Sequence, residues 1–103
     1  MAYRVEIARQ AELEASESFL WRIERLSVEA AVKWYNELMI SVGTLAEMPG
    51  RCGLAPENDC FEDEIQQLHD GKRSSSYRIL FKIRGETVYV LHIVHGTMNT
   101  LTA

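Results

Sequence analysis

The residues of this sequence best suited to chemistry lie in one stretch, YRILFKIRGETVYVLHIVHG, at positions 77–96. Its first half carries three cations, Arg78, Lys82 and Arg84, and its second half carries His92 and His95. Arginine and lysine can hold a phosphate or a carboxylate, and histidine can exchange protons near neutral pH. Such a set could process a phosphodiester or bind an acidic partner, if the fold brings the side chains to one face.

Alternating apolar residues predict two strands here, joined by Gly85 and Glu86 in a type II′ turn. In this register Arg84 pairs with Thr87, and outward along the hairpin Arg78 lies opposite Ile93. One face of the hairpin is then apolar and packs on helices. The opposite face combines cations with large apolar groups, and its members are Arg78, Leu80, Lys82, Arg84, Tyr89, Leu91, Ile93 and His95.

The two histidines are three positions apart in a strand, so they point to opposite faces and do not chelate one metal ion. We expect His92 to be a hydrogen-bonded core residue, and His95, diagonal to Arg78, to be the candidate for acid–base chemistry. Cys52 and Cys60 lack zinc-ligand spacing, and a disulfide between them is not favoured in a reducing compartment. The sequence therefore predicts no metal site and no cofactor.

Periodicity along the rest of the chain predicts the elements that position the hairpin. Residues 3–7 alternate like a strand, residues 11–26 form an amphipathic helix, and Ser27 is placed to cap a second helix that ends before Pro49. A long loop at 49–63 precedes a weaker strand at 64–69. The order strand, helix, helix and three strands predicts an α+β fold with a mainly antiparallel four-stranded sheet, in one domain spanning 1–103.

Charge is distributed unevenly along the 103 residues, whose net charge is -4. Residues 1–64 hold 6 Lys+Arg against 13 Asp+Glu, whereas residues 65–103 hold 5 against 2. An acidic chain is a poor non-specific binder of nucleic acid, so only a local basic face remains for that role. No apolar run is long enough for a membrane span or typical of a signal peptide, which predicts the cytoplasm.

Large apolar groups on the mixed face of the hairpin need an explanation, because an uncovered sheet face is normally polar. We expect them to bind a protein partner. The alternative is that the long loop or residues 97–103 fold over this face. The predicted partner-binding residues are Leu80, Lys82, Tyr89, Leu91 and Ile93.

The order of the elements and several motifs resemble the RelE/ParE superfamily of toxins. The resemblance covers most of the chain, and its most specific part is the strand YRILFKI followed by the terminal histidine of the next strand. The matching segments are YRVEI at 3–7, LAEMPGRCGLAPE at 45–57, EIQQL at 64–68, YRILFKI at 77–83 and ETVYVLHIVHG at 86–96.

This resemblance implies a bacterial toxin of a type II toxin–antitoxin module, neutralised by a cognate antitoxin. Members of the superfamily divide between ribosome-dependent mRNA endonucleases and inhibitors of DNA gyrase. For the endonucleases, Arg78 matches the strand arginine that holds the scissile phosphate and His95 matches the terminal histidine. Glu64 or Lys82 would assist them.

Three departures favour a toxin that is not a nuclease. Gln66 and Gln67 stand where many relatives have arginine, Thr97-Met98-Asn99 replaces another common arginine, and no tyrosine follows the last strand. We therefore predict a ParE-like toxin that binds a target protein such as DNA gyrase. Two alternatives stay open: an mRNA endonuclease that uses Arg78 and His95 on the ribosome, and a non-toxic interaction domain that forms a homodimer.

Overall fold

The structure is a computed structural model that describes residues 2–56, 58, 62–70 and 77–95. Within these ranges the elements confirm the predicted α+β order and most of the predicted boundaries. They are β1 (Arg4–Ile7), α1 (Arg9–Arg25), α2 (Val28–Thr44), the short 3-10 helix η1 (Pro49–Arg51), β2 (Gln66–Asp70), β3 (Tyr77–Arg84) and β4 (Thr87–His95).

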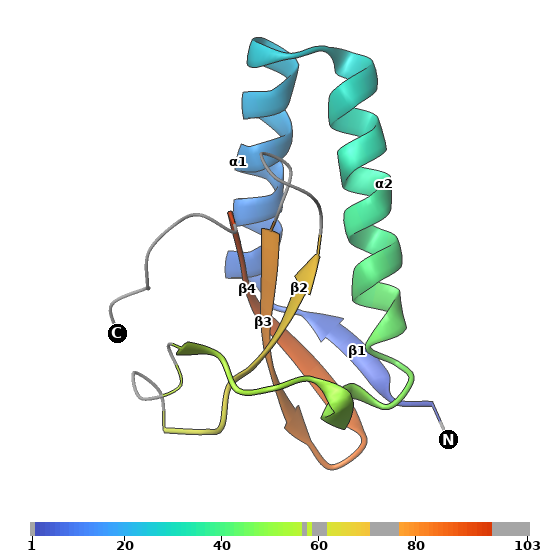
Figure 1. The fold of residues 1–103 in the computed structure, drawn as a ribbon, viewed down its shortest axis with the longest axis vertical. Coiled ribbons are helices and arrows are strands. Elements are labelled where there is room, and N and C mark those ends of the chain that lie inside the picture. Colours follow the sequence, from blue (N-terminus) through green and yellow to red (C-terminus); the bar gives the residue numbers. More distant parts are fainter. Residues whose placement is uncertain (1, 57, 59–61, 71–76, 96–103) are drawn as a thin grey trace.

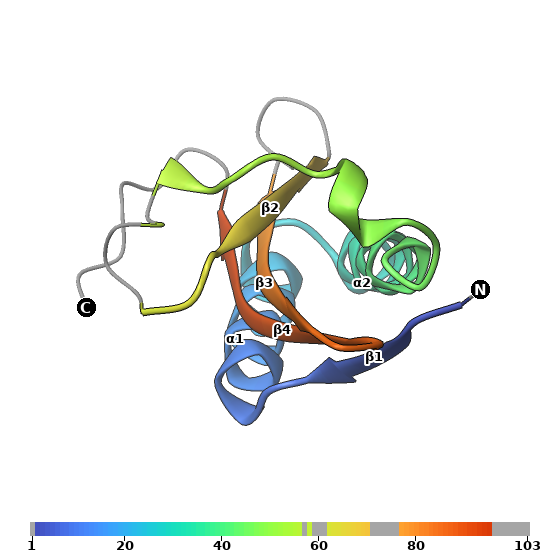
Figure 2. The ribbon, with the colours of Figure 1, turned by 90° about the horizontal axis from the view of Figure 1, so that it is seen from below.

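The four strands form one sheet in the order β1-β4-β3-β2. Strand β1 runs parallel to β4, whereas the β2/β3 and β3/β4 pairs are antiparallel, so the sheet is mixed and mainly antiparallel. Figure 1 shows the two helices standing side by side over the sheet, and Figure 2 shows α1 on the side of β3 and β4 away from the segment that follows α2. The hairpin β3/β4 is therefore the centre of the sheet.

The helical hairpin is fixed at its tip by the predicted N-cap. The Oγ atom of Ser27 accepts a hydrogen bond from the backbone N–H of Ala30 at 3.0 Å, which satisfies a donor of the first turn of α2. Only residues 26 and 27 separate the two helices, so α1 and α2 must run antiparallel (Figure 1).

Few residues of the amphipathic helix α1 are buried. Leu20 and Leu26 are 58% and 64% exposed, whereas the buried residues of α1 are Ala11, Ala15 and Arg22. The core beneath the helices is built mainly from large apolar side chains of α2 and the central hairpin. It includes Trp34, Leu38, Val42, Leu45, Tyr77, Ile79, Phe81, Val88 and Val90.

Arg22 is a buried cation of helix α1. Its guanidinium carbon lies 4.1 Å from the centre of the Trp34 ring. Trp34 in turn packs edge-on against Tyr77, whose hydroxyl lies 3.1 Å from the Oγ atom of Ser41. Burial lowers the pKa of Arg22, and the aromatic face compensates part of the lost hydration of the cation.

Candidate functional site

The hairpin that carries the candidate residues follows the predicted register only as far as Val90. Arg84 pairs with Thr87 and Phe81 pairs with Val90, as expected. Gly85 has a φ of 59°, and Glu86 is not among the described residues with positive φ, which agrees with a type II′ turn. The turn chemistry therefore correctly set the first half of the pairing.

Beyond Val90 the predicted register is wrong, because β4 contains a bulge. Leu80 pairs with His92 directly after Phe81 pairs with Val90, so Leu91 is an extra residue with no partner of its own. An extra residue moves every later side chain to the other face. Ile93 consequently pairs with Ile79 and is 4% exposed in the core, not on the open face where partner binding was predicted.

His92 is hydrogen-bonded, as predicted, but it is half-buried and its partner is a carboxylate of α1. Its Nδ1 atom lies 3.1 Å from the carboxylate oxygen Oε2 of Glu14. The other carboxylate oxygen of Glu14 accepts a hydrogen bond from the backbone N–H of Ile93 at 2.9 Å. Strand β1 pairs with β4 only as far as Val90, so Glu14 supplies an acceptor where the neighbouring strand has ended. No periodicity in the sequence pointed to this role of Glu14.

Leu80, predicted to be exposed for partner binding, is fully buried. It packs in a small cluster with Ala55 and Ile65, and Leu91 packs against this cluster from its edge. The backbone N–H of Ala55 donates to the carbonyl of Ile65 at 2.8 Å, which holds the covering segment to the strand. The alternative in which the long loop covers part of this face is therefore correct at Leu80.

Arg78 lies on a covered part of the sheet. It is 8% exposed, and its Nη1 atom donates to the side-chain oxygen of Gln67 on β2 at 3.1 Å. The register pairs Arg78 with Val94 and pairs His95 with Tyr77, so the predicted position of Arg78 opposite Ile93 is wrong. The side chain of His95 and all of Cys60 lie outside the described residues, so the geometry of an Arg78/His95 pair stays a prediction.

Two cations at the turn end of β3 share one carboxylate. The Nζ atom of Lys82 and the Nη2 atom of Arg84 lie 3.0 and 2.8 Å from the same oxygen, Oδ2 of Asp63. Tyr89 pairs with Lys82 across the hairpin. The hydrogen bonds from Arg84 and Lys82 lower the pKa of Asp63, and Asp63 raises the pKa of Arg84. The exposed part of the mixed face is therefore basic, and the carboxylate of Asp63 neutralises part of its positive charge.

Replacing Asp63 with asparagine is expected to weaken the pH dependence of stability. Because the folded pKa of Asp63 lies below its unfolded value of about 3.9, its contribution is present above that value and lost as pH falls through the folded pKa. Urea unfolding at about pH 6 and about pH 3 should show a smaller difference for Asp63→Asn than for the wild type. Glu62→Gln, at an exposed neighbour, is the control, and an equal difference in both variants would contradict the role of Asp63.

The described residues offer no group of three His, Cys, Asp or Glu side chains arranged to hold a metal ion. The thiol of Cys52 is free, and burial raises its pKa while the charge of Arg51 partly opposes this. In the same part of the chain, no helix combines the length and the apolar character that crossing a membrane requires. The contacts around the turn end of the hairpin define the candidate site. It is the surface formed by Lys82, Arg84, Tyr89 and Leu91, with Asp63 at its border.

Two solved structures share this fold, in which two helices lie on a sheet of order β1-β4-β3-β2. A chain of the chromosomal ParDE toxin–antitoxin system from P. aeruginosa has the same fold, with a TM-score of 0.76 and 14% sequence identity over 91% of this chain and 96% of that chain. The E. coli toxin RelE, as a double arginine-to-alanine mutant in the free state, gives a TM-score of 0.61 and 18% identity over 94% of this chain and 86% of that chain.

The family model described as the ParE toxin of the type II toxin–antitoxin system parDE matches residues 5–100. The chain therefore belongs to the ParE toxin family. A search among curated proteins gave no match.

Proposed function

We propose that this ParE-type toxin acts in the cytoplasm by binding a target protein, with DNA gyrase as the first candidate, and that a cognate antitoxin neutralises it. The observation that carries the proposal is the state of Arg78. A nuclease needs a cation that faces the scissile phosphate and stabilises its developing charge. Arg78 is instead buried, and it donates to Gln67.

The remaining cations of the face also suit a protein partner. Lys82 and Arg84 both donate hydrogen bonds to the carboxylate of Asp63. A carboxylate from a partner protein could take the place of Asp63 and accept the same two hydrogen bonds. Leu91 and Tyr89 are half-buried and add apolar and aromatic surface beside these charges. Mixed aromatic, apolar and arginine surfaces are typical of protein–protein contacts. The acidic net charge of the chain further disfavours docking on RNA.

Induced expression is expected to arrest growth while cellular mRNA stays intact, and the purified chain is expected to inhibit supercoiling by gyrase. The double variant Arg78→Met/His95→Gln should arrest growth as the wild type does, because target binding is assigned to the surface around Lys82 and Arg84. Lys82→Ala/Arg84→Ala should lose inhibition while its circular dichroism stays native. Co-expression of a cognate antitoxin should restore growth.

The outcomes separate the candidate functions. Cleaved mRNA that depends on Arg78 and His95 would replace this proposal with the endonuclease. Growth arrest with intact mRNA and unaffected gyrase would retain a protein-binding toxin but exclude gyrase as the target. Unaffected growth at full expression of the folded chain would favour the non-toxic interaction domain.

A further inference from the structure

Asp63 is the carboxylate on which Lys82 and Arg84, named here the cation pair, converge. Because the two cations are two positions apart in β3, they lie on the same face of the sheet. Among the ion pairs between described side chains, this is the one in which two cations share a single carboxylate. The two cations exceed the one carboxylate in charge, so this place stays positive while Asp63 occupies it.

Asp63 belongs to the segment that covers the sheet on the side away from α1, and this segment is anchored without it (Figure 2). Two residues further on, the backbone N–H of Ile65 donates to Oδ1 of Asn58 at 2.8 Å. The carbonyl of Ile65 accepts from the N–H of Ala55 at 2.8 Å, and the Ile65 side chain is buried. Asp63 can therefore leave the cation pair without detaching the segment from the sheet.

The contact between Asp63 and the cation pair is open to water. The side chains of Asp63 and Arg84 are 40% and 62% exposed, and exposed ion pairs are weak because water screens them. Arg84 donates to Asp63 through Nη2, whereas a guanidinium can hold a carboxylate through two parallel N–H bonds. A carboxylate that approaches from outside the chain can therefore bind the cation pair at least as well as Asp63 does.

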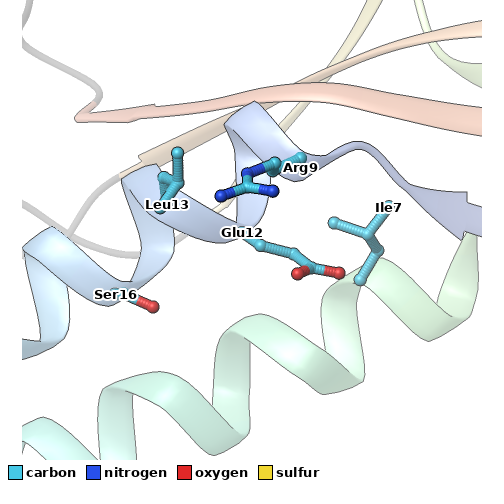
Figure 3. A pocket seen from close by; sticks show the side chains of 5 residues that line it. All are labelled: Ile7, Arg9, Glu12, Leu13 and Ser16. Atoms are coloured by element: carbon cyan, nitrogen blue, oxygen red, sulfur yellow. The ribbon is translucent and has the colours of Figure 1, made fainter.

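A hollow beside the start of α1 shows, by contrast, what is particular about the cation pair. The hollow has a volume of about 490 Å³, and one cation, Arg9, and one carboxylate, Glu12, both line it (Figure 3). These charges balance, so an incoming anion gains no net attraction there. At the cation pair an incoming anion still meets an excess of positive charge.

We propose that Asp63 is an intramolecular competitor for an aspartate or glutamate side chain of the target protein, which must displace Asp63 from the cation pair. The inference rests on the proposed function, in that it takes this surface to contact the target. Tyr89 and Leu91 are half-buried beside the pair and offer apolar surface to the same partner. A partner that covers them excludes water from its own carboxylate, and attraction between charges is stronger where water is excluded.

This competition makes the surface selective. An acidic segment that brings no apolar contacts meets Asp63 already in place and gains little by replacing it. A target that combines a carboxylate with apolar groups displaces Asp63, because its own ion pair is better shielded. Asp63 is thus an element that acts against the wrong partners, as specific interfaces commonly require.

A hexaglutamate peptide, titrated into the purified full chain and followed by NMR at the backbone amides of Lys82 and Arg84, tests the competition without any target. Asp63→Asn should bind this peptide about fivefold more tightly than the wild type, because two exposed ion pairs no longer compete. Glu62→Gln removes the same charge from an exposed neighbour and should bind as the wild type does. Asp63→Glu keeps a competing carboxylate and should also stay near the wild type.

A second pair of variants tests whether Asp63 acts through the cation pair. Lys82→Gln/Arg84→Gln should bind the peptide more weakly than the wild type. Adding Asp63→Asn to this double variant should change the affinity no more than adding Glu62→Gln does, since the group for which Asp63 competes is gone. Circular dichroism of each variant confirms that the fold is retained.

Supercoiling by gyrase provides the functional measurement. Asp63→Asn should inhibit at about one-fifth of the concentration that the wild type needs, and Glu62→Gln should match the wild type. If the peptide results are as expected and gyrase is unaffected by every variant, the competition by Asp63 is supported and gyrase is excluded as the target.

Equal peptide affinities of Asp63→Asn and Glu62→Gln would overturn the proposal, and so would a gain from Asp63→Asn that persists without the cation pair. Displacement of the peptide by inorganic phosphate at far lower concentration than by acetate, at equal ionic strength, would also overturn it, because the cation pair would then be a phosphate site. Inhibition of gyrase by the wild type alongside any of these results would retain the proposed function and reject the competition by Asp63.

Discussion

Replacing Leu80 with alanine should lower the free energy of unfolding by about 2–4 kcal/mol, because the side chain is fully enclosed by Ala55, Ile65 and the sheet. The cavity left behind cannot be filled without moving the covering segment. Urea denaturation followed by circular dichroism measures the change. Detachment of the segment should also expose Cys52, so thiol labelling should become faster.

Leu91→Ala is the matched control for Leu80→Ala. Leu91 touches the same cluster from its half-buried edge, so the same truncation should cost less than about half as much. Equal, small effects at both positions would mean that Leu80 is not enclosed in solution. Leu80 would then return to the exposed face, as the sequence alone predicts.

Glu14→Ala should be the second most damaging substitution, lowering the free energy of unfolding by about 2–3 kcal/mol. It removes an acceptor from the N–H of Ile93 and from the His92 ring, and it leaves the amide without a strand neighbour on that side. Hydrogen exchange at the Ile93 amide should accelerate more than the global change in stability explains. This local readout distinguishes the lost hydrogen bond from a general loosening of the core.

Glu14→Gln should recover most of the stability lost in Glu14→Ala, since the amide oxygen of glutamine still accepts from a backbone N–H. Glu17→Ala removes an exposed carboxylate of the same helix and should be nearly neutral. If Glu17→Ala costs as much as Glu14→Ala, the effect comes from the helix and not from its contact with β4.

Much of the fold was predictable because it rests on local patterns. The strands at 77–84 and 87–95, the turn at Gly85 and the cap at Ser27 each depend on neighbouring residues, and each was confirmed. The second half of β4 was not predictable in this way. Its bulge has no glycine or proline to mark it, and it depends on where β1 ends and on a carboxylate from α1.

The candidate site was less accessible to sequence reasoning, because its state depends on contacts between distant segments. Nothing local to Arg78 indicates that Gln67 will hold it, or that Asp63 will meet Lys82 and Arg84 from a segment without periodicity. The buried position of Arg22 has the same cause, since its partner Trp34 belongs to another helix. The pattern of a single sequence predicts which face of a helix or strand is apolar. It does not predict which side chains of two different elements will contact each other.

The extra residue at Leu91 divides β4 into two segments that are out of phase with each other. A relative without this residue would present at each position after Val90 the side chain that this chain presents one place later. Comparison with such a relative therefore needs a one-residue gap at this point before residues near the end of the strand are matched. Without that gap, a core position such as Ile93 would be matched to a surface position.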